Sequence, residues 1–353
     1  MPRPEHALDQ VQDPDYLPLP AAGLGAQVTD ETDRRAGPRG KTGGCGAPAR
    51  MDGWRCLATQ GRFPMCEILT RENLTSVTKL FRVSAPAVAR KARAGQFVII
   101  RTHERGERIP LTIADYDGEQ GTITLVVQEV GKTTLHMGTM QVGDSFASLT
   151  GPLGLPSEIE CYGTVICVGG GFAIAPLFPI ARALKDAGNT VLSVIGARSA
   201  DLLFWEERMQ AVSDELIVCT DDGSCGRQAL VTAPLRELLA ARRTIDRVWA
   251  IGPAVMMKFC ALTTRPFGVR TIVNLNPIMV DGTGMCGACR VEVGGQTRFA
   301  CVDGPEFDGH QVDWDLLLAR QRIYVEQEKR ATERWEREQG GHRRGLADGQ
   351  GGA

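Results

Sequence analysis

The feature that most constrains the fold is an alternation of apolar strand-like and helix-like segments in the middle of the chain. TVICVGGG is typical of a buried strand that enters a glycine-rich turn, and IAPLFPIARALKDAGN is typical of the helix that follows it. VLSVIGAR, ELIVCTDDG, RVWAIGP and VRTIVNLN continue the series as strands, with segments such as LLFWEERMQAV and VMMKFCALTTR between them. Such alternation predicts an α/β domain with a doubly wound parallel sheet over residues 156–275.

A different rhythm precedes this alternation. CEILTRENL, VTKLFRVSA, QFVIIRT, RIPLTIAD and GTITLVVQEV are short β segments, closely spaced and separated by turns that contain glycine. GDSFASLTGPLG closes the series. This pattern predicts a small antiparallel β barrel over residues 65–155.

The two ends of the chain are expected to lie outside these domains. Residues 1–50 contain seven Pro and seven Gly and show no apolar periodicity, which is typical of disordered sequence. Residues 1–64 are therefore predicted to be a disordered extension, with Met51 or Met65 as a hypothetical alternative start. Residues 313–353 predict a charged helix that ends near Gln339, followed by a flexible tail.

Composition argues against several classes of partner. A formal net charge of −2 gives no reason to expect nucleic acid or an anionic membrane surface. No run approaches the roughly 20 apolar residues of a transmembrane helix, and the first residues do not resemble a secretory signal. The eleven cysteines are odd in number and mostly scattered, so a reduced, cytoplasmic setting is expected rather than a disulfide framework.

The strongest chemical signal is the segment DGTGMCGAC, which begins at Asp281. Four residues separate Asp281 from Cys286, two separate Cys286 from Cys289, and eleven separate Cys289 from Cys301. Plant-type [2Fe–2S] sites space their ligands C-x4-C-x2-C…C, so the three cysteines occupy the last three positions and Asp281 the first. The interleaved glycines let the backbone wrap closely around a cluster. Residues 276–312 are therefore predicted to form a [2Fe–2S] segment.

Two other interpretations of this segment stay open. The cysteines could hold zinc, although a Cys3Asp set is unusual for a structural zinc site, or they could be buried thiols in a glycine-rich turn. Asp281 precedes glycine, which is also ordinary turn chemistry. If Asp281 is a ligand, its harder oxygen should give the cluster a different potential from an all-cysteine one.

Glycines and acidic residues also follow three of the predicted parallel strands. A glycine-rich turn between a strand and a helix lets a dinucleotide pyrophosphate approach backbone N–H groups, and ligands of such sheets bind at the carboxyl ends of the strands. The first turn departs from G-x-G-x-x-G, because Phe172 and Ala173 follow the glycines. Arg198 after the second strand could contact a 2′-phosphate, which leaves the choice between NAD and NADP open. The candidate residues at this edge are Gly169, Gly170, Gly171, Asp221, Asp222, Gly252 and Pro253.

The barrel segment carries a third, weaker signal. An arginine can pair bidentately with a pyrophosphate, and a threonine hydroxyl or a backbone N–H can bond the edge of a flavin ring. Residues of this kind are Arg108, Pro110, Leu111, Thr112, Gly131, Lys132 and Thr133. His136 is expected to be structural, and Met256 and Met257 are expected in the core. Five cysteines in apolar segments are predicted to be inert buried thiols, namely Cys66, Cys161, Cys167, Cys219 and Cys260.

In the order barrel, nucleotide sheet and cysteine segment, the chain resembles the ferredoxin-reductase-like electron-transfer subunits with a C-terminal [2Fe–2S] domain. That family includes the electron-transfer subunit of dihydroorotate dehydrogenase. The resemblance covers roughly residues 65–335 and is most specific in ERIPLTIADYD, VGGGFAIAPLFPIARALK and NPIMVDGTGMCGACRVEVGGQTRFACVDGPEFDGHQVDW. The dihydroorotate-type subunit has cysteine at the first ligand position. The branch that shares aspartate there is the small subunit of NADH-dependent ferredoxin:NADP+ oxidoreductase, also named a sulfide dehydrogenase subunit.

The resemblance implies three cofactor sites and no catalytic side chain, because the cofactors carry the chemistry. FAD would lie on Arg108, Pro110, Leu111, Thr112, Gly131, Lys132 and Thr133. NAD(H) would lie with its pyrophosphate at Gly169, Gly170 and Gly171 and its nicotinamide end near Asp221, Asp222, Gly252 and Pro253. The [2Fe–2S] cluster would be ligated by Asp281, Cys286, Cys289 and Cys301.

The resemblance also implies a partner. This is a larger flavoprotein subunit, similar to the glutamate synthase small chain, which carries [4Fe–4S] clusters and through which electrons reach ferredoxin. The complex would bifurcate electrons, whereas this chain alone could not. An electron-transfer subunit of a dihydroorotate or sulfide dehydrogenase, or a non-catalytic zinc-binding assembly module, are the alternatives.

Overall fold

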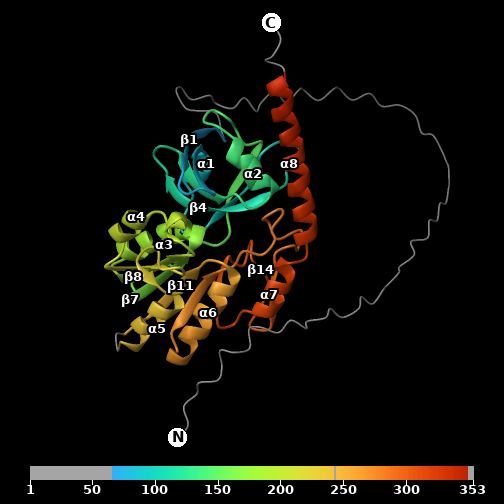
Figure 1. Cartoon of the computed structure of the whole chain (residues 1–353). Coiled ribbons are helices and arrows are strands. Elements are labelled where there is room, and N and C mark those ends of the chain that lie inside the picture. Colours follow the sequence, from blue (N-terminus) through green and yellow to red (C-terminus); the bar gives the residue numbers. More distant parts are fainter. Residues whose placement is uncertain (1–65, 242–243, 349–353) are drawn as a thin grey trace, which may run out of the picture. The chain divides into compact units, whose positions relative to one another are not determined.

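The computed structural model describes residues 66–241 and 244–348 (Figure 1). The predicted N-terminal extension and the alternative starts lie outside these residues. Within the described part of the chain, no helix combines the length and the apolar character that a bilayer crossing requires.

The first domain is the predicted antiparallel β barrel, and the structure confirms its fold. Its six strands are β1 (Ile68–Asn73), β2 (Thr78–Ser84), β3 (Phe97–Arg101), β4 (Ile109–Asp117), β5 (Thr122–Gln128) and β6 (Ser148–Leu153), antiparallel in the order β1-β2-β5-β4-β3-β6. The chain before β6 hydrogen-bonds to the start of β1, with Ile68 donating to the Asp144 carbonyl at 2.8 Å, which closes the ring. Fully buried side chains such as Phe81, Ile100 and Leu125 fill the interior.

The barrel also contains two helices, α1 (Pro86–Ala89) and α2 (Lys132–Thr139). The strand pattern did not predict α2. Its N-terminus is formed locally, because the Thr134 hydroxyl accepts hydrogen bonds from the backbone N–H groups of Val130 and Gly131, both at 3.0 Å. This side chain satisfies donors that a helix start leaves free.

The predicted doubly wound sheet is also confirmed. Its parallel strands are β7 (Thr164–Gly170), β8 (Thr190–Ala197), β9 (Glu215–Thr220), β11 (Arg247–Ile251) and β12 (Arg270–Asn274), with short β10 (Arg227–Gln228) beside β9. The spatial order is β10-β9-β8-β7-β11-β12-β15. Because the order reverses direction beside β7, the carboxyl ends of β7 and β11 meet at a topological switch point.

Helices cover both faces of this sheet (Figure 1). Val165 and Cys167 of β7 pack with α3 (Ile174–Asp186), while Ile166 and Val168 pack with α5 (Thr232–Ala240) and α6 (Ala254–Thr264). Successive side chains of a strand point to opposite faces, so a strand buried on both sides reads as a continuous apolar run. The short helix α4 (Glu206–Ala211) follows the 3-10 turn Ala200–Leu202.

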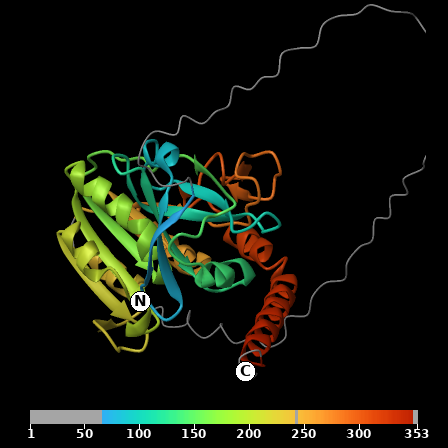
Figure 2. The ribbon, with the colours of Figure 1, turned by 90° about the horizontal axis from the view of Figure 1, so that it is seen from above.

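The cysteine segment is built into the nucleotide sheet rather than appended to it. It contains the hairpin β13 (Arg290–Val293) and β14 (Gln296–Phe299), and then β15 (Glu306–Asp308), which pairs antiparallel with β12 at the edge of the sheet. Helices α7 (Trp314–Gln321) and α8 (Val325–Asp348) follow, and α8 runs past α2 of the barrel (Figures 1 and 2). The charged helix is thus two helices, and α8 extends beyond the predicted end near Gln339. It does so across the consecutive glycines Gly340 and Gly341, each of which costs a helix about 1 kcal/mol relative to alanine.

Candidate functional site

The four predicted cluster ligands fold into two neighbouring pairs. Cys289 and Cys301 are both 2% exposed, and their sulfur atoms lie 3.2 Å apart. Asp281 lies beside Cys286, whose backbone N–H donates to Asp281 Oδ2 at 2.9 Å. Within the described residues, no three His, Cys, Asp or Glu side chains converge on one point as a single metal ion requires. Two pairs of donors suit a two-iron cluster better than one tetrahedral zinc ion.

Backbone hydrogen bonds and burial set the protonation of two of the predicted ligands, Asp281 and Cys301. The N–H groups of Thr283 and then Cys286 hold the pKa of the Asp281 carboxyl below its ordinary value, so it is ionised. Burial and the adjacent Cys289 raise the pKa of the Cys301 thiol to about 12, partly offset by the backbone N–H of Gly284. A thiol with this pKa binds metal by releasing a proton, because the thiolate is the ligand.

Glycines shape this loop as the sequence predicts. Gly282, Gly284 and Gly287 all have positive φ, of 77°, 84° and 67°. A Cβ at Gly282 would lie 2.7 Å from Leu153 and 2.9 Å from Ile99, which belong to barrel strands β6 and β3. The loop between Asp281 and Cys286 therefore packs directly on the barrel, which the sequence pattern alone did not indicate.

The predicted flavin residues lie on β4, just before it, and at the start of α2. Pro110 of β4 pairs with Ile99 of β3, the residue against which the cluster loop packs. Arg108 stands exposed just before β4. Its neighbour Glu107 accepts a 2.8 Å hydrogen bond from the Thr133 hydroxyl and lies 3.8 Å from the Lys132 ammonium, which joins the start of β4 to the start of α2. A helix N-terminus beside an exposed arginine is suited to a pyrophosphate.

The glycine turns after β7 and β11 are also adjacent. A Cβ at Gly170 would lie 2.3 Å from the Met256 sulfur, and one at Gly252 would lie 2.6 Å from the Met256 methyl group. These two glycines therefore allow close packing around Met256. Gly171 differs, since it has a φ of 59° and nothing within 4 Å of the Cβ position. Of the three predicted pyrophosphate glycines, Gly171 is thus the one with open surroundings.

The acidic pair after β9 lies elsewhere on this edge. β8 separates β9 from β7, so Asp221 and Asp222 are two strands away from Gly171. The backbone N–H of Asp222 donates to the Arg198 carbonyl at 3.2 Å, and Ser224 donates to Asp222 while accepting from the Ala200 N–H. The structure brings Asp221 and Asp222 to Arg198 rather than to Gly252 and Pro253.

Residues predicted to be structural divide into two groups. Cys167, Cys219, Cys260 and Met257 are fully buried, and burial raises the pKa of the Cys167 and Cys260 thiols to about 12. The prediction is wrong for Cys161, which is exposed in the linker before β7, and Cys66 is half-buried.

His136 is half-buried against His103, with ring centroids 5.4 Å apart, and burial lowers its pKa. Met256 is half-buried at the switch point.

One half-buried acid was not singled out by the sequence pattern. Glu306 of β15 accepts a hydrogen bond from the Ser157 hydroxyl at 2.6 Å and one from the Trp249 indole at 3.4 Å. Burial raises its pKa to about 7, although both hydrogen bonds act in the opposite direction. The carboxyl group thus joins the cysteine segment to the linker after the barrel and to β11 of the sheet.

Comparison with known proteins agrees with this architecture. Residues 276–313 match the iron–sulfur cluster binding domain of dihydroorotate dehydrogenase B. The chain is 53% identical over 269 residues to a dihydroorotate dehydrogenase B (NAD(+)) electron transfer subunit homolog of Thermotoga maritima, covering 76% of this chain and 95% of that protein. It is 31% identical over 254 residues to the electron transfer subunit of Geobacillus thermodenitrificans, covering 69% and 96%.

Solved structures give the same result. A chain of the NADH-dependent reduced ferredoxin-NADP oxidoreductase, described in a study of flavin-based electron bifurcation, is 51% identical with a TM-score of 0.75, covering 78% of this chain and 99% of that one. The ferredoxin reductase of carbazole 1,9a-dioxygenase is 18% identical with a TM-score of 0.51, covering 57% and 64%, and shares the fold.

Proposed function

This chain belongs to the family of dihydroorotate dehydrogenase B electron-transfer subunits and their homologues, and we propose that it passes electrons between NAD(H), FAD and one [2Fe–2S] cluster and on to a larger subunit. The observation that carries the proposal is the short separation between the two predicted redox sites. Gly282 of the cluster loop packs on Ile99, and Ile99 pairs with Pro110 in the predicted flavin strand. One residue of β3 therefore separates the two sites.

The residues present fit the three cofactors. Cys289 with Cys301, and Asp281 with Cys286, would hold the cluster, and the buried cysteine pair excludes water from one side of it. Arg108 and the N-terminus of α2 would hold the FAD pyrophosphate, while the backbone of Leu111 and the hydroxyl of Thr112 would bond the flavin ring. Gly171 would admit the NAD pyrophosphate, with Asp221 and Asp222 toward the adenosine side, next to Arg198.

The chemistry would come from the bound groups, which supply hydride exchange with the nicotinamide and one-electron transfer. The protein would hold the nicotinamide, the flavin and the cluster in position. The close packing of Gly170 and Gly252 around Met256 fixes the ends of β7 and β11, where the nicotinamide would lie. The turn formed by the Asp281 carboxylate fixes the path from Asp281 to Cys286. No side chain of the chain has to exchange a proton in this scheme.

The surface beside the cluster loop supports a protein partner. Met285, next to Cys286, is 89% exposed, and Val280 and Val302 near the same loop are 46% and 40% exposed. Exposed apolar side chains around a redox site suit a docking surface. We propose that the partner is a larger subunit resembling the glutamate synthase small chain, with [4Fe–4S] clusters, and that ferredoxin is reached through that complex.

A second candidate is an electron-transfer subunit for dihydroorotate oxidation, which the names of the relatives favour. The two candidates differ in the partner and not in this chain's cofactors. Co-expression with each kind of partner, followed by measurement of NADH-dependent ferredoxin:NADP+ activity and of dihydroorotate oxidation, would separate them.

Anaerobic titration of the purified chain with NADH is expected to bleach the flavin absorbance and then produce the EPR signal of a reduced [2Fe–2S] cluster. The order follows because the cluster loop packs on β3, which pairs with the predicted flavin strand β4. Optical and EPR spectra are recorded on the same samples. A well-folded preparation with stoichiometric zinc and no flavin would contradict the proposal and favour the zinc-binding assembly module.

Asp281→Asn is expected to alter the EPR spectrum of the reduced cluster and to lower the iron content. The amide oxygen of asparagine can still accept the N–H of Thr283, which donates to Asp281 Oδ1 at 2.7 Å. Its NH2 group cannot accept the N–H of Cys286, which donates to Asp281 Oδ2 at 2.9 Å, so one of the two turn bonds is kept while the negative charge is lost. Thr283→Ala is the matched control, because it changes the same turn without removing a donor to iron. Unchanged spectra and iron content in Asp281→Asn would reduce Asp281 to a turn residue.

A further inference from the structure

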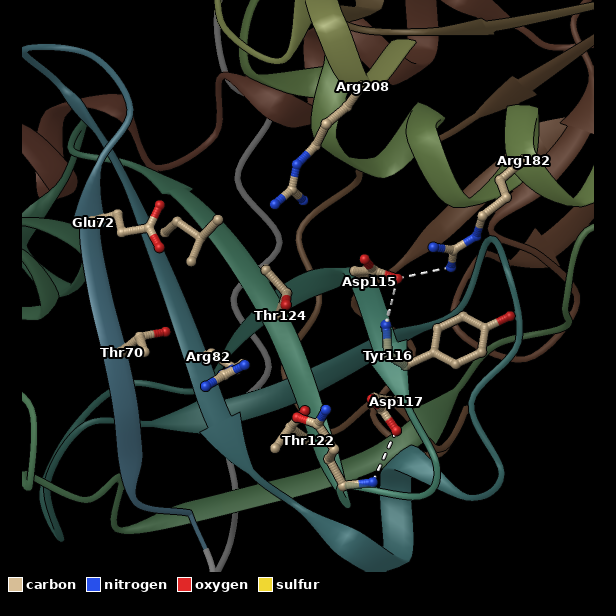
Figure 3. A pocket seen from close by; sticks show the side chains of 12 residues that line it. Thr70, Glu72, Arg82, Asp115, Tyr116, Asp117, Thr122, Thr124, Arg182 and Arg208 are labelled. Atoms are coloured by element: carbon tan, nitrogen blue, oxygen red, sulfur yellow. Dashed lines mark hydrogen bonds and ion pairs between the residues drawn. The ribbon is translucent and has the colours of Figure 1, made fainter. Parts of the chain in front are cut away.

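A polar groove lies where the barrel meets α3 and α4, on the later part of β4 rather than on the predicted flavin residues (Figure 3). Its volume is about 560 Å³, within the range of about 300–1,000 Å³ that small-molecule sites occupy. The strands β1, β2, β5 and β4 form its floor, and the helices α3 and α4 form its wall. None of the residues predicted to bind FAD, NAD(H) or the cluster lines it.

The floor carries one arginine between two hydroxyls. Thr70 pairs with Arg82 across β1 and β2, and Arg82 pairs with Thr124 across β2 and β5. Residues directly opposite each other in neighbouring strands place their side chains side by side on one face. Thr124 in turn lies opposite Asp115 of β4. The row is therefore hydroxyl, guanidinium, hydroxyl and carboxylate.

The cations of the groove are not all neutralised. Arg182 of α3 pairs with Asp115 at 2.7 Å, as Figure 3 shows. Arg82 has no carboxylate partner among the described residues, and its Nε is buried without a hydrogen-bond partner there. Arg208 of α4 stacks on Trp205, with its guanidinium 4.5 Å from the ring centroid, and reaches toward the floor. Arg82 and Arg208 therefore bring positive charge to the groove that no carboxylate of the described residues pairs with, and an anionic ligand would pair with both guanidinium groups.

We propose that this groove binds a phosphorylated, hydroxyl-rich small molecule of the sugar phosphate or nucleoside monophosphate class. Arg82 and Arg208 hold the phosphate from two sides, and the hydroxyls of Thr70 and Thr124 donate to its remaining oxygens. Asp117 and Glu72 at the rim of the groove accept from ligand hydroxyls and repel a second anionic group. This distribution favours one phosphate with neutral polar substituents over a polyphosphate. The site is independent of the proposed electron path.

The test uses the flavin- and cluster-loaded chain with saturating NAD+, so that the nucleotide edge is already occupied. Isothermal titration calorimetry with ribose 5-phosphate is expected to give a dissociation constant below about 1 mM, and ribose is expected to bind at least tenfold more weakly. Arg82→Gln and Arg208→Gln are each expected to weaken ribose 5-phosphate binding by about tenfold or more, since each removes a charge-assisted hydrogen bond.

Arg236→Gln is the matched control, because Arg236 is exposed on α5, outside the groove, and its loss changes the net charge equally. Arg208 is also exposed, so Arg208→Gln keeps the test valid if Arg82→Gln does not fold. The absence of binding to the unaltered chain would overturn the proposal. Equal affinities in all three variants, or equal affinities for ribose and ribose 5-phosphate, would overturn it too.

Discussion

Cys301→Ser is expected to leave the chain without its iron–sulfur cluster and to stop electron transfer to the partner, while the flavin remains reducible by NADH. Cys301 is buried, 3.2 Å from the sulfur of Cys289, and is one of the three predicted sulfur ligands. A serine hydroxyl is a harder and far less acidic donor than a thiol. Replacing a residue that hydrogen-bonds to a metal ligand lowers metal affinity roughly 10–100-fold, and loss of the ligand itself should lower it further.

The matched control is Cys260→Ser. Cys260 is equally buried, on α6, and its thiol pKa is also raised to about 12 by burial. The same sulfur-to-oxygen change there should cost on the order of 1 kcal/mol of stability and leave the iron content unchanged. Iron and acid-labile sulfide analysis of both variants, with an NADH titration of the flavin, checks the prediction. A full iron content in Cys301→Ser would remove Cys301 from the ligand set.

Much of this architecture could be predicted from local sequence pattern. The parallel strands are continuous apolar runs in the sequence because they are buried on both faces. For example, the neighbouring residues Val165 and Ile166 of β7 belong to two different core clusters, one on each face of the sheet. The ligand spacing from Asp281 to Cys289 is set by the backbone that surrounds a cluster, so it is visible in the chain itself. Both signals depend on residues that are close in sequence.

The remaining features depend on residues that are distant in sequence. The strand β15 has three residues and includes Glu306 and Asp308, so it gives no apolar alternation, and it exists because β12 offers a free edge. The contact of Gly282 with Ile99 joins two motifs whose glycine and isoleucine each have an ordinary local explanation. The separation of Asp221 from Gly252 follows from strand order, which alternation alone does not specify.

Glu306 is the one of these long-range features with a large expected effect on stability. Its carboxyl group is held by Ser157 and Trp249, at 2.6 and 3.4 Å, and Gly95 of the barrel approaches it so closely that a Cβ would lie 3.2 Å from its Oε1. Burial raises its pKa from 4.5 to about 7. The folded chain therefore binds a proton more tightly than the unfolded chain between these values.

The sign of the effect follows from this linkage. Because the unfolded state has fewer protons bound over this range, the free energy of unfolding falls as pH rises from about 4.5 to about 7. Glu306→Gln removes this titration and is expected to flatten the pH dependence, so that the variant gains up to about 3 kcal/mol relative to the unaltered chain between pH 5 and pH 8. The amide oxygen of glutamine can still accept from the Trp249 indole while its NH2 group donates to the Ser157 hydroxyl, so the two bonds are kept and the slope carries the test.

Urea unfolding at several pH values, on the cofactor-loaded chain, measures this slope. Glu160→Gln is the control, because Glu160 is exposed in the same linker and is not among the groups that shift the pKa of Glu306, so its loss should leave the slope nearly unchanged. If Glu306→Gln retained the full pH dependence, the buried proton would have to be assigned to another group. If the slope disappeared, Glu306 would be the group whose ionisation weakens the attachment of the edge strand β15 to the barrel and the sheet as pH rises.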